Sequence, residues 1–211
     1  MAAPEISVLV DREGWPDDAE RFLASLERHR GGRDVEVVGV EQVSEIGFGA
    51  AHDRTLAKAA GDVVVVVDTS LELTGDLLRA LVGALDDPTV AVAGPFGLTT
   101  ADLCDYEERT DGDVAAVQGY CLAARRSELL AAGGVRPEFT WYRNADIDMS
   151  LRLRTLDGPV RRAVAIGADG CIRHIHRAWE ATPEEQRSEL SRHNMGIVHE
   201  VFFGRKDLVV P

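Results

Sequence analysis

The sequence has few cysteines, and they are not spaced like a disulfide framework or a structural zinc site. Cys104, Cys121 and Cys171 are an odd number in 211 residues, and no CxxC pair occurs. Long apolar runs are also missing. The longest aliphatic run, at 63–67, is far too short to span a bilayer, and no basic stretch leads into an apolar segment near the first residue. These absences predict a cytoplasmic protein with no transmembrane segment.

Basic residues are outnumbered. The 23 Lys and Arg residues against 36 Asp and Glu residues give a net charge of −13. Such a charge repels phosphate backbones and anionic membranes at long range, so we expect no nucleic-acid partner. A small phosphorylated ligand remains compatible, because a bound cation or a helix N-terminus supplies positive potential locally. Hydrophobic residues make up 45% of the chain, which suffices for an ordinary core in a single domain spanning 1–211.

In the first half, apolar runs of five or six residues alternate with segments of helical period, which is typical of strands joined by crossover helices. We expect strands at 6–10, 35–40 and 63–67, and helices at 17–30 and 50–60. The valine run at 63–67 lacks polar alternation, so it is expected to be covered on both faces. The pattern predicts an α/β fold with a mostly parallel central sheet flanked by helices.

The second half has a less regular pattern. A polar stretch at 98–113 shows no clear period, and an aromatic loop at 139–142 precedes a helical segment. The expected elements are helices at 75–85, 146–156 and 184–202, a turn or short helix at 125–132, and strands at 90–93, 115–123 and, once or twice, between 160 and 175.

Three polar segments follow the three predicted strands of the first half. They begin at Asp11, Glu41 and Asp68. Ligands of open parallel sheets bind beyond the carboxyl ends of the strands, so these side chains are expected to line one rim. Asp68 could hold a divalent cation whose other ligands come from a diphosphate. The alternative is that Asp68, Thr69 and Ser70 only form a turn.

A second candidate lies at the start of the predicted helix at 146–156. Asp146 is either an N-cap or a general base that removes a proton from a bound hydroxyl. In the catalytic hypothesis, Trp141 and Tyr142 supply an apolar platform for a sugar ring. Asp148 points to another side of the helix and is expected to be a supporting or a solvated residue.

Two further segments carry candidate ligand-binding groups. In an extended segment, His174 and His176 would share a face and could coordinate a metal, with Arg173 and Arg177 able to reach phosphate. The alternative is an exposed basic edge. The second segment, GFGAAH at 47–52, places Gly49 near a helix start, where free backbone amides could contact a nucleotide; a plain turn is the alternative.

Taken in this order, the segments resemble a family-2 glycosyltransferase of the GT-A fold, over nearly the whole chain. ISVLV and VEVVGV are similar to the opening half-Rossmann unit of that family. GFGAAHDRTLAKAAGDVVVVVDTS is similar to its helix, strand and Asp-x-Asp segment, and VQGYCLAARRSELLAAGGVRPEF to its acceptor-side stretch. YRNADIDMSLRLR is similar to its Glu-Asp-x-Asp-Leu helix start. The resemblance implies donor binding by 1–95, a smaller mixed acceptor and catalytic region at 96–180, and a C-terminal helix and tail at 181–211.

The resemblance also implies an activity and a set of roles. The activity is inverting transfer of a sugar from a nucleoside-diphosphate sugar to a hydroxyl-bearing acceptor, with Mg²⁺ or Mn²⁺. Asp146 would be the base, Asp68 the first aspartate of the metal motif, and His174, rather than His176, the preferred histidine ligand. The remaining residues implied to contact the donor are Asp11, Glu41, Gly49, Gly119, Arg173 and Arg177, and those implied to contact the acceptor are Arg126, Trp141 and Tyr142.

The chain departs from the family pattern at several of these positions. Ser70 stands at the second metal-binding aspartate, Ala145 at the glutamate before the base, and Gly39 at an aspartate that often ends the second strand. The alternative function is therefore a catalytically inactive GT-A-like module that binds a nucleotide or a protein. A sugar-nucleotide nucleotidyltransferase ranks last, because the chain lacks the Gly-rich basic phosphate loop of that group near residue 1.

Overall fold

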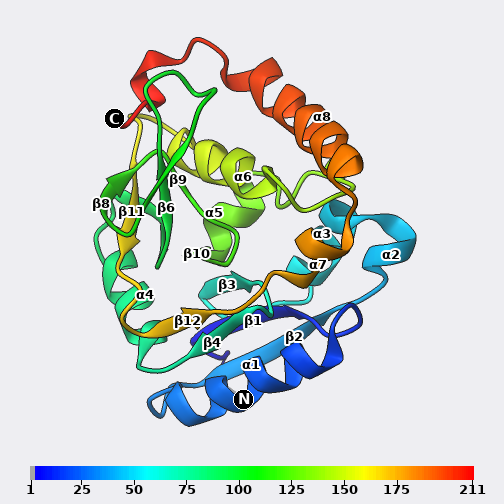
Figure 1. Ribbon diagram of the computed structural model, residues 1–211. Coiled ribbons are helices and arrows are strands. Elements are labelled where there is room, and N and C mark those ends of the chain that lie inside the picture. The colour runs from blue at the N-terminus through cyan, green and yellow to red at the C-terminus, as the bar shows by residue number, and fades with distance from the viewer. Residues whose placement is uncertain (1–2) are drawn as a thin grey trace.

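The computed structural model describes residues 3–211 and contains a large central sheet with helices on both faces (Figure 1). The seven strands of this sheet are β1 (Ile6–Asp11), β2 (Val35–Val40), β3 (Val63–Val67), β5 (Val90–Gly94), β8 (Asp111–Val114), β10 (Cys121–Arg125) and β11 (Arg162–Ile166). Their order is β2-β1-β3-β10-β5-β11-β8. β1 is parallel to β2 and β3, and β11 is parallel to β5, whereas β10 and β8 run antiparallel to their neighbours. The predicted α/β fold with a mostly parallel sheet is confirmed.

Helices cover the two faces of the sheet because successive side chains along each strand point to opposite sides. The helices are α1 (Pro16–His29), α2 (Val43–Ile46), α3 (Phe48–Leu56), α4 (Leu77–Leu85), α5 (Arg126–Ala131), α6 (Ala145–Arg154), α7 (Arg177–Ala181), α8 (Glu184–Phe202) and the 3-10 helix η1 (Lys206–Leu208). Val65 of β3 packs in one core with α1 and α4, and Val64 packs in a second core with α3, α5 and α6. The valine run is buried on both faces, as predicted.

Two small sheets and the C-terminal helix complete the arrangement. β12 (Cys171–Arg173) pairs with β4 (Leu71–Leu73), and β6 (Gly97–Thr99) lies between β7 (Glu107–Arg109) and β9 (Ala116–Val117). α8 packs beside α6 over a third core that includes Phe139 and Leu208 (Figure 1). None of the helices described for residues 3–211 is both long enough and apolar enough to cross a membrane.

One sequence prediction about elements is wrong. The strand expected at 115–123 is two strands, because β9 ends at Val117 and β10 begins at Cys121, with a turn between them. The polar stretch at 98–113, for which the sequence predicted no element, contains β7 and most of β8. All three residues of β7 are exposed, which explains why the sequence there shows no apolar alternation.

Candidate active site

Asp68 lies at the carboxyl end of β3 and forms a turn in which its two carboxylate oxygens have different partners. Its backbone N–H donates to the Tyr120 carbonyl at 3.1 Å, which continues the pairing of β3 with β10. Oδ1 accepts from the Ser70 amide at 2.8 Å and from the Ser70 hydroxyl. Oδ2 instead lies 3.2 Å from Nε2 of His176. One oxygen therefore stabilises the turn, and the other pairs with the His176 imidazole.

His176 is fixed in place by the start of α7. Its Nδ1 accepts the backbone N–H of Trp179 at 3.1 Å and caps the helix, so Nε2 is the nitrogen that faces Asp68. Burial works against a charge on either side chain, but their hydrogen bond and mutual attraction outweigh it: the pKa of Asp68 is lowered and that of His176 is raised. The pair is thus held as a close carboxylate–imidazole couple.

Asp146 sits in the first turn of α6 and is not the N-cap. The cap position belongs to Asn144, whose backbone is left-handed, with a φ of 66°. Oδ2 of Asp146 accepts the Gly119 amide at 2.8 Å, and Oδ1 accepts the amide of Ile147 at 3.0 Å. Burial raises the pKa of Asp146, and the hydrogen bond from Gly119 and the charge of Arg143 only partly offset this effect. A carboxylate with a raised pKa suits proton abstraction.

The turn between β9 and β10 brings Asp68 and Asp146 together. Gly119 donates to the side chain of Asp146, and the next residue, Tyr120, accepts from the backbone of Asp68. A Cβ at Gly119 would meet Asp146 Oδ2 at 3.4 Å, so the backbone there lies directly against the carboxylate. The sequence did not predict this turn, yet it is what connects the two acidic residues.

A row of rings extends from this centre. The Tyr142 ring stacks on His176 with centroids 4.6 Å apart, Trp141 lies 4.6 Å from Tyr142, and Trp179 stacks on Trp141 at 6.0 Å. The hydroxyl of Tyr142 is buried and has no hydrogen-bond partner among residues 3–211. The two predicted aromatic residues, Trp141 and Tyr142, therefore lie at the site, beside Trp179, which sequence reasoning missed.

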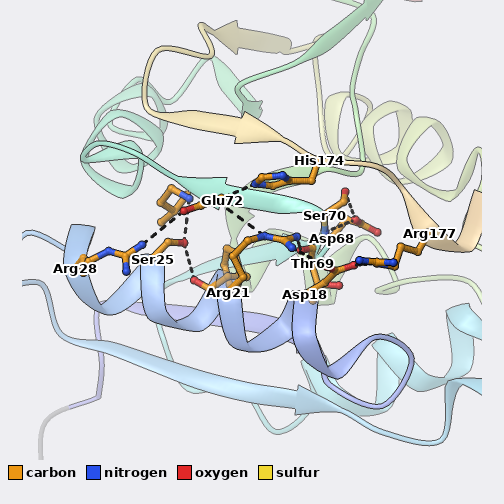
Figure 2. Close-up of polar contacts among 12 residues, drawn as sticks. Asp18, Arg21, Ser25, Arg28, Asp68, Thr69, Ser70, Glu72, His174 and Arg177 are labelled. Carbon is orange, nitrogen blue, oxygen red and sulfur yellow. Dashed lines mark hydrogen bonds and ion pairs between the residues drawn. The ribbon is translucent and has the colours of Figure 1, made fainter.

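The preference for His174 as the metal ligand is wrong in this geometry. Its Nε2 lies 2.8 Å from Glu72, on the α1 side of β12, as Figure 2 shows. Glu72 also attracts Arg28 at 3.6 Å and Arg21 at 4.0 Å. β12 ends at Arg173, so the two histidines do not alternate as on one strand, and His176 alone reaches Asp68.

The two arginines predicted to reach phosphate are already occupied by carboxylates. Arg173 forms two hydrogen bonds to Glu108, at 2.6 and 2.8 Å. Nε of Arg177 donates to Asp18 at 2.7 Å, and Asp18 also accepts from Arg21 (Figure 2). In this structure Arg173 uses both terminal nitrogens in its ion pair, whereas Arg177 uses only Nε, so their contact with a diphosphate stays a prediction.

The donor-side expectations at Gly49, Asp11 and Glu41 have mixed outcomes. The Gly49 amide donates to the Phe139 carbonyl at 2.8 Å, and a Cβ there would lie 1.9 Å from the Arg136 carbonyl, so Gly49 serves packing rather than a nucleotide contact. Asp11 follows Val10, the register partner of Val67, and therefore ends beside Asp68. Its Oδ1 caps a turn by accepting from the amide of Glu13 at 2.9 Å.

Glu41 lies at the same end of the sheet as Asp11 and Asp68, two strands away from Asp68, because it follows Val40, the register partner of Asp11, whereas Arg126 lies at the opposite end. Glu41 is exposed after β2 and lies 3.7 Å from Lys58. The Arg126 amide donates to the Asp62 carbonyl, at the amino end of β3. Because β10 is antiparallel to β3, the residues after β10 lie at the far end of β3 from Asp68, roughly 15–20 Å away at about 3.3 Å per residue. The acceptor role expected for Arg126 is incompatible with that position.

The residues that sequence reasoning missed sit next to those that it found. Tyr120 follows Gly119, Arg143 follows Tyr142, and Trp179 lies one helical turn after His176. Adjacency to a predicted site residue was the available signal. Asn194 gave no such signal: it lies far along the chain in α8 and is fully buried, with its amide donating to the carbonyls of Trp141 and Arg143 at 2.8 and 2.7 Å.

The donor set at the centre fits a divalent cation that arrives with a phosphate ligand. Within 3–211, no group of three or more His, Cys, Asp or Glu side chains is arranged to hold a metal ion. Asp68 offers one carboxylate oxygen, and His176 would offer Nε2 once its ring proton moves to Nδ1, which would break the hydrogen bond from the Trp179 amide. Mg²⁺ is commonly bound by one or two protein groups, with substrate phosphates and water completing its shell. The two residues therefore fit such a shared site and do not form a complete cage.

Comparisons with known proteins place the architecture among the glycosyltransferases. No family model and no curated protein sequence matches the chain. The structure of GalNAc-T7 with UDP, GalNAc and Mn²⁺ matches with a TM-score of 0.70 and 13% identity, over 97% of this chain and 49% of that one. The mannosyltransferase PcManGT from Pyrobaculum calidifontis, in complex with GDP-Man and Mn²⁺, matches with a TM-score of 0.67 and 16% identity, over 95% and 65%.

A third match is the catalytic domain of Drosophila beta1,4-galactosyltransferase 7 in complex with xylobiose, with a TM-score of 0.59 and 16% identity, over 89% of this chain and 79% of that one. The chain has a GT-A-like fold, as the sequence resemblance implied. It spans about half the length of the first structure and less than two thirds of the second.

Proposed function

We propose that this chain is a metal-dependent glycosyltransferase that moves a sugar, with inversion, from a nucleoside-diphosphate sugar to a hydroxyl-bearing acceptor. One observation carries the proposal: two carboxylates far apart in the sequence, Asp68 and Asp146, are joined by the backbone of Gly119 and Tyr120. One of them is paired with an imidazole and the other has a raised pKa. The carboxylate–imidazole pair suits binding of a metal that stabilises the leaving group, and the carboxylate with the raised pKa suits proton removal.

In the proposed reaction, Asp146 takes the proton of the acceptor hydroxyl while that oxygen attacks the anomeric carbon. The bond from this carbon to the diphosphate breaks as the new glycosidic bond forms, and the diphosphate carries away the electron pair. Asp68 and His176 would hold Mg²⁺ or Mn²⁺, which supplies positive charge for the leaving diphosphate. Tyr142 and Trp141 would pack against the sugar rings, because flat aromatic faces suit their apolar surfaces.

The matched structures support the substrate class. They contain UDP with Mn²⁺ in one case and GDP-Man with Mn²⁺ in another, on the same fold. We therefore expect the donor to occupy the rim formed by Asp11 and Asp68, and the acceptor to approach from the side of Asp146. Residues 1–95 would hold the donor and residues 96–180 the acceptor.

The replacement of Asp146 by Asn tests the assignment of the base. Asp146→Asn keeps the size and one hydrogen-bond acceptor but cannot take a proton. We expect nucleoside-diphosphate binding to stay within about twofold, while turnover falls by about 10²–10⁴-fold, the usual contribution of a general base. Release of nucleoside diphosphate from a panel of UDP- and GDP-sugars measures turnover. Parental turnover in Asp146→Asn would refute this role.

A second candidate function is a catalytically inactive GT-A-like module that binds a nucleotide or a protein. The observation that favours it is Ser70, which stands at the expected second metal ligand and gives its hydroxyl to Asp68. Such a module would release no nucleoside diphosphate from any sugar nucleotide, and Mn²⁺ would not change its affinity for nucleotides. The enzyme must release nucleoside diphosphate and must bind nucleotides more tightly with Mn²⁺, so the same reagents distinguish the two functions.

A further inference from the structure

Two arginines meet at one indole beside the proposed acceptor side. Cζ of Arg143, from the loop before α6, lies 5.2 Å from the ring centroid of Trp179. Cζ of Arg187, from α8, lies 4.6 Å from the same centroid. Trp179 itself belongs to α7 and stacks on Trp141. Three segments that are separate in the sequence thus bring two guanidinium groups to one aromatic platform.

Neither guanidinium forms an ion pair within 4.0 Å in the part of the chain that the structure describes. The side chain of Arg187 donates to the Trp179 carbonyl at 3.3 Å, whereas that of Arg143 has no hydrogen bond to any residue from 3 to 211. Arg173 and Arg177, by contrast, each bind a carboxylate. In a chain with 36 acidic and 23 basic residues, two neighbouring cations without a carboxylate are a local concentration of positive charge that favours a bound anion.

The loop that carries Arg143 is held rigidly next to Asp146. Asn194 donates to the Arg143 carbonyl at 2.7 Å, and the amide of Asn144 donates to the Ser191 carbonyl at 3.0 Å, so α8 fixes the loop from both residues. The positive charge of Arg143 also lowers the pKa of Asp146 against the effect of burial. A group bound by Arg143 is therefore within electrostatic reach of the base.

His176, which with Asp68 is proposed to hold the metal, lies at the other end of the aromatic row. From His176 the row passes through Tyr142 and Trp141 before it reaches Trp179, in ring-to-ring steps of 4.6, 4.6 and 6.0 Å. A donor diphosphate held at Asp68 and His176 would thus lie at the far end of the row from Arg187, whereas the charge of Arg143 still reaches His176 and acts to lower its pKa. An anion bound by both arginines beside Trp179 would therefore belong to the acceptor.

We propose that Arg143, from the loop before α6, and Arg187, from α8, bind a carboxylate or phosphate group of the acceptor beside Trp179. The enzyme would then glycosylate hydroxyl compounds that carry an anionic group. This inference rests on the proposed function and names its acceptor class. Guanidinium groups bind both anions through charge-assisted hydrogen bonds, and Trp179 with Trp141 gives the carbon skeleton an apolar surface.

Matched acceptor pairs test the inference. Each pair differs by one anionic group: glycerol and glycerol 3-phosphate, glycerol and glycerate, glucose and glucuronate. We expect the anionic member of at least one pair to raise nucleoside-diphosphate release at least tenfold over its neutral partner. Arg143→Gln and Arg187→Gln should each lower this preference about 10- to 100-fold, the usual effect of losing a hydrogen bond to a charged group. Equal rates within every pair would overturn the proposal.

Controls separate a specific role from misfolding. Arg192→Gln removes an exposed arginine from the same helix, α8, and should keep the preference. Arg143→Lys and Arg187→Lys keep the charge and should retain more of the preference than the glutamine variants. Thermal unfolding of each variant reports whether the fold is intact. An anionic preference that survives in both glutamine variants would also contradict the assignment.

Nucleotide binding shows whether the arginines bind the donor diphosphate instead of the acceptor. It also shows whether the proposed function itself fails. UDP and GDP should bind the glutamine variants with Mn²⁺ as they bind the parent; weaker binding in these variants would assign the arginines to the donor diphosphate and overturn the inference. If the parent binds no nucleotide, the proposed function fails. Titration of glycerol 3-phosphate then still reports on the arginine pair, because its binding requires no donor.

Discussion

The environment of Asp146 sets a pH dependence that an exposed aspartate would not show. Burial raises its pKa above the ordinary value of 3.8, and only the ionised form can accept a proton. Turnover is therefore expected to fall as the pH drops through a value above 3.8, while donor binding changes less. A pH–rate profile under saturating donor measures this limb. An activity that is constant down to pH 3.8 would contradict a raised pKa at the base.

The two histidines show how far residue-level reasoning could go. Alternation along a strand drew attention to the segment but did not distinguish His174 from His176, and the family resemblance favoured His174. Their difference depends on where β12 ends and on the partners Glu72 and Asp68, which come from other parts of the chain. Arg126 failed for the same kind of reason, since only the antiparallel direction of β10 shows that it lies at the far end of β3.

At the scale of elements, Asp18 connects α1 to the start of α7. Its side chain is 4% exposed and accepts from Arg21 and Arg177, each at 2.7 Å. Burial would raise the pKa of Asp18, but these two hydrogen bonds outweigh it and the pKa is lowered. The contact therefore contributes stability above the ordinary carboxyl pKa and loses it as the pH falls through the lower folded-state value.

Replacing Asp18 tests this connection. Asp18→Asn should lower the free energy of unfolding by about 1–3 kcal/mol at pH 7, because two charged donors lose their charged acceptor. The difference from the parent should shrink as the pH falls below 3.8. Urea denaturation at pH 7 and pH 3 measures both effects, with the exposed Asp17→Asn as the matched control. An equal loss in the two variants would show that the contact is not specific.

A second connection between elements runs through Asn194. Its side-chain amide ties α8 to the loop that carries Trp141, Tyr142 and Arg143. Asn194→Ala leaves two carbonyls without their donor and should cost about 1–3 kcal/mol of stability, whereas His193→Ala, at an exposed position on the same helix, should have little effect. Thermal or urea unfolding of the two variants measures this difference in stability. If both variants unfold alike, the loop does not depend on α8.

The elements themselves were predictable where their hydrophobic pattern was strong. The valine run at 63–67 and the final helix at 184–202 match β3 and α8. The pattern gave no warning of the break between β9 and β10, because residues 115–123 are apolar enough to suggest one strand. What interrupts them is tertiary structure: the Gln118 amide donates to the Phe96 carbonyl, and the turn then brings Gly119 to Asp146.

At the scale of the whole molecule, the fold gathers its few site residues from distant segments. The parallel pairing of β1 and β3 places Asp11 beside Asp68, a feature that the alternation of strands and helices already predicted. The approach of α6 and of the segment before α7 to the same edge could not be read from local periodicity. It depends on the order of β10, β5 and β11 in the sheet, and on α8 holding the aromatic loop.

In the proposed function, Asp68 and His176 hold a cation together with the diphosphate of a nucleotide. Isothermal titration calorimetry with UDP and GDP, in Mn²⁺ or in EDTA, measures this coupling. We expect Mn²⁺ to tighten binding at least tenfold in the parent and in Asp62→Asn, an exposed aspartate at the other end of β3, but not in Asp68→Asn. Equal affinity in Mn²⁺ and EDTA for the parent, or a full Mn²⁺ effect in Asp68→Asn, would contradict it.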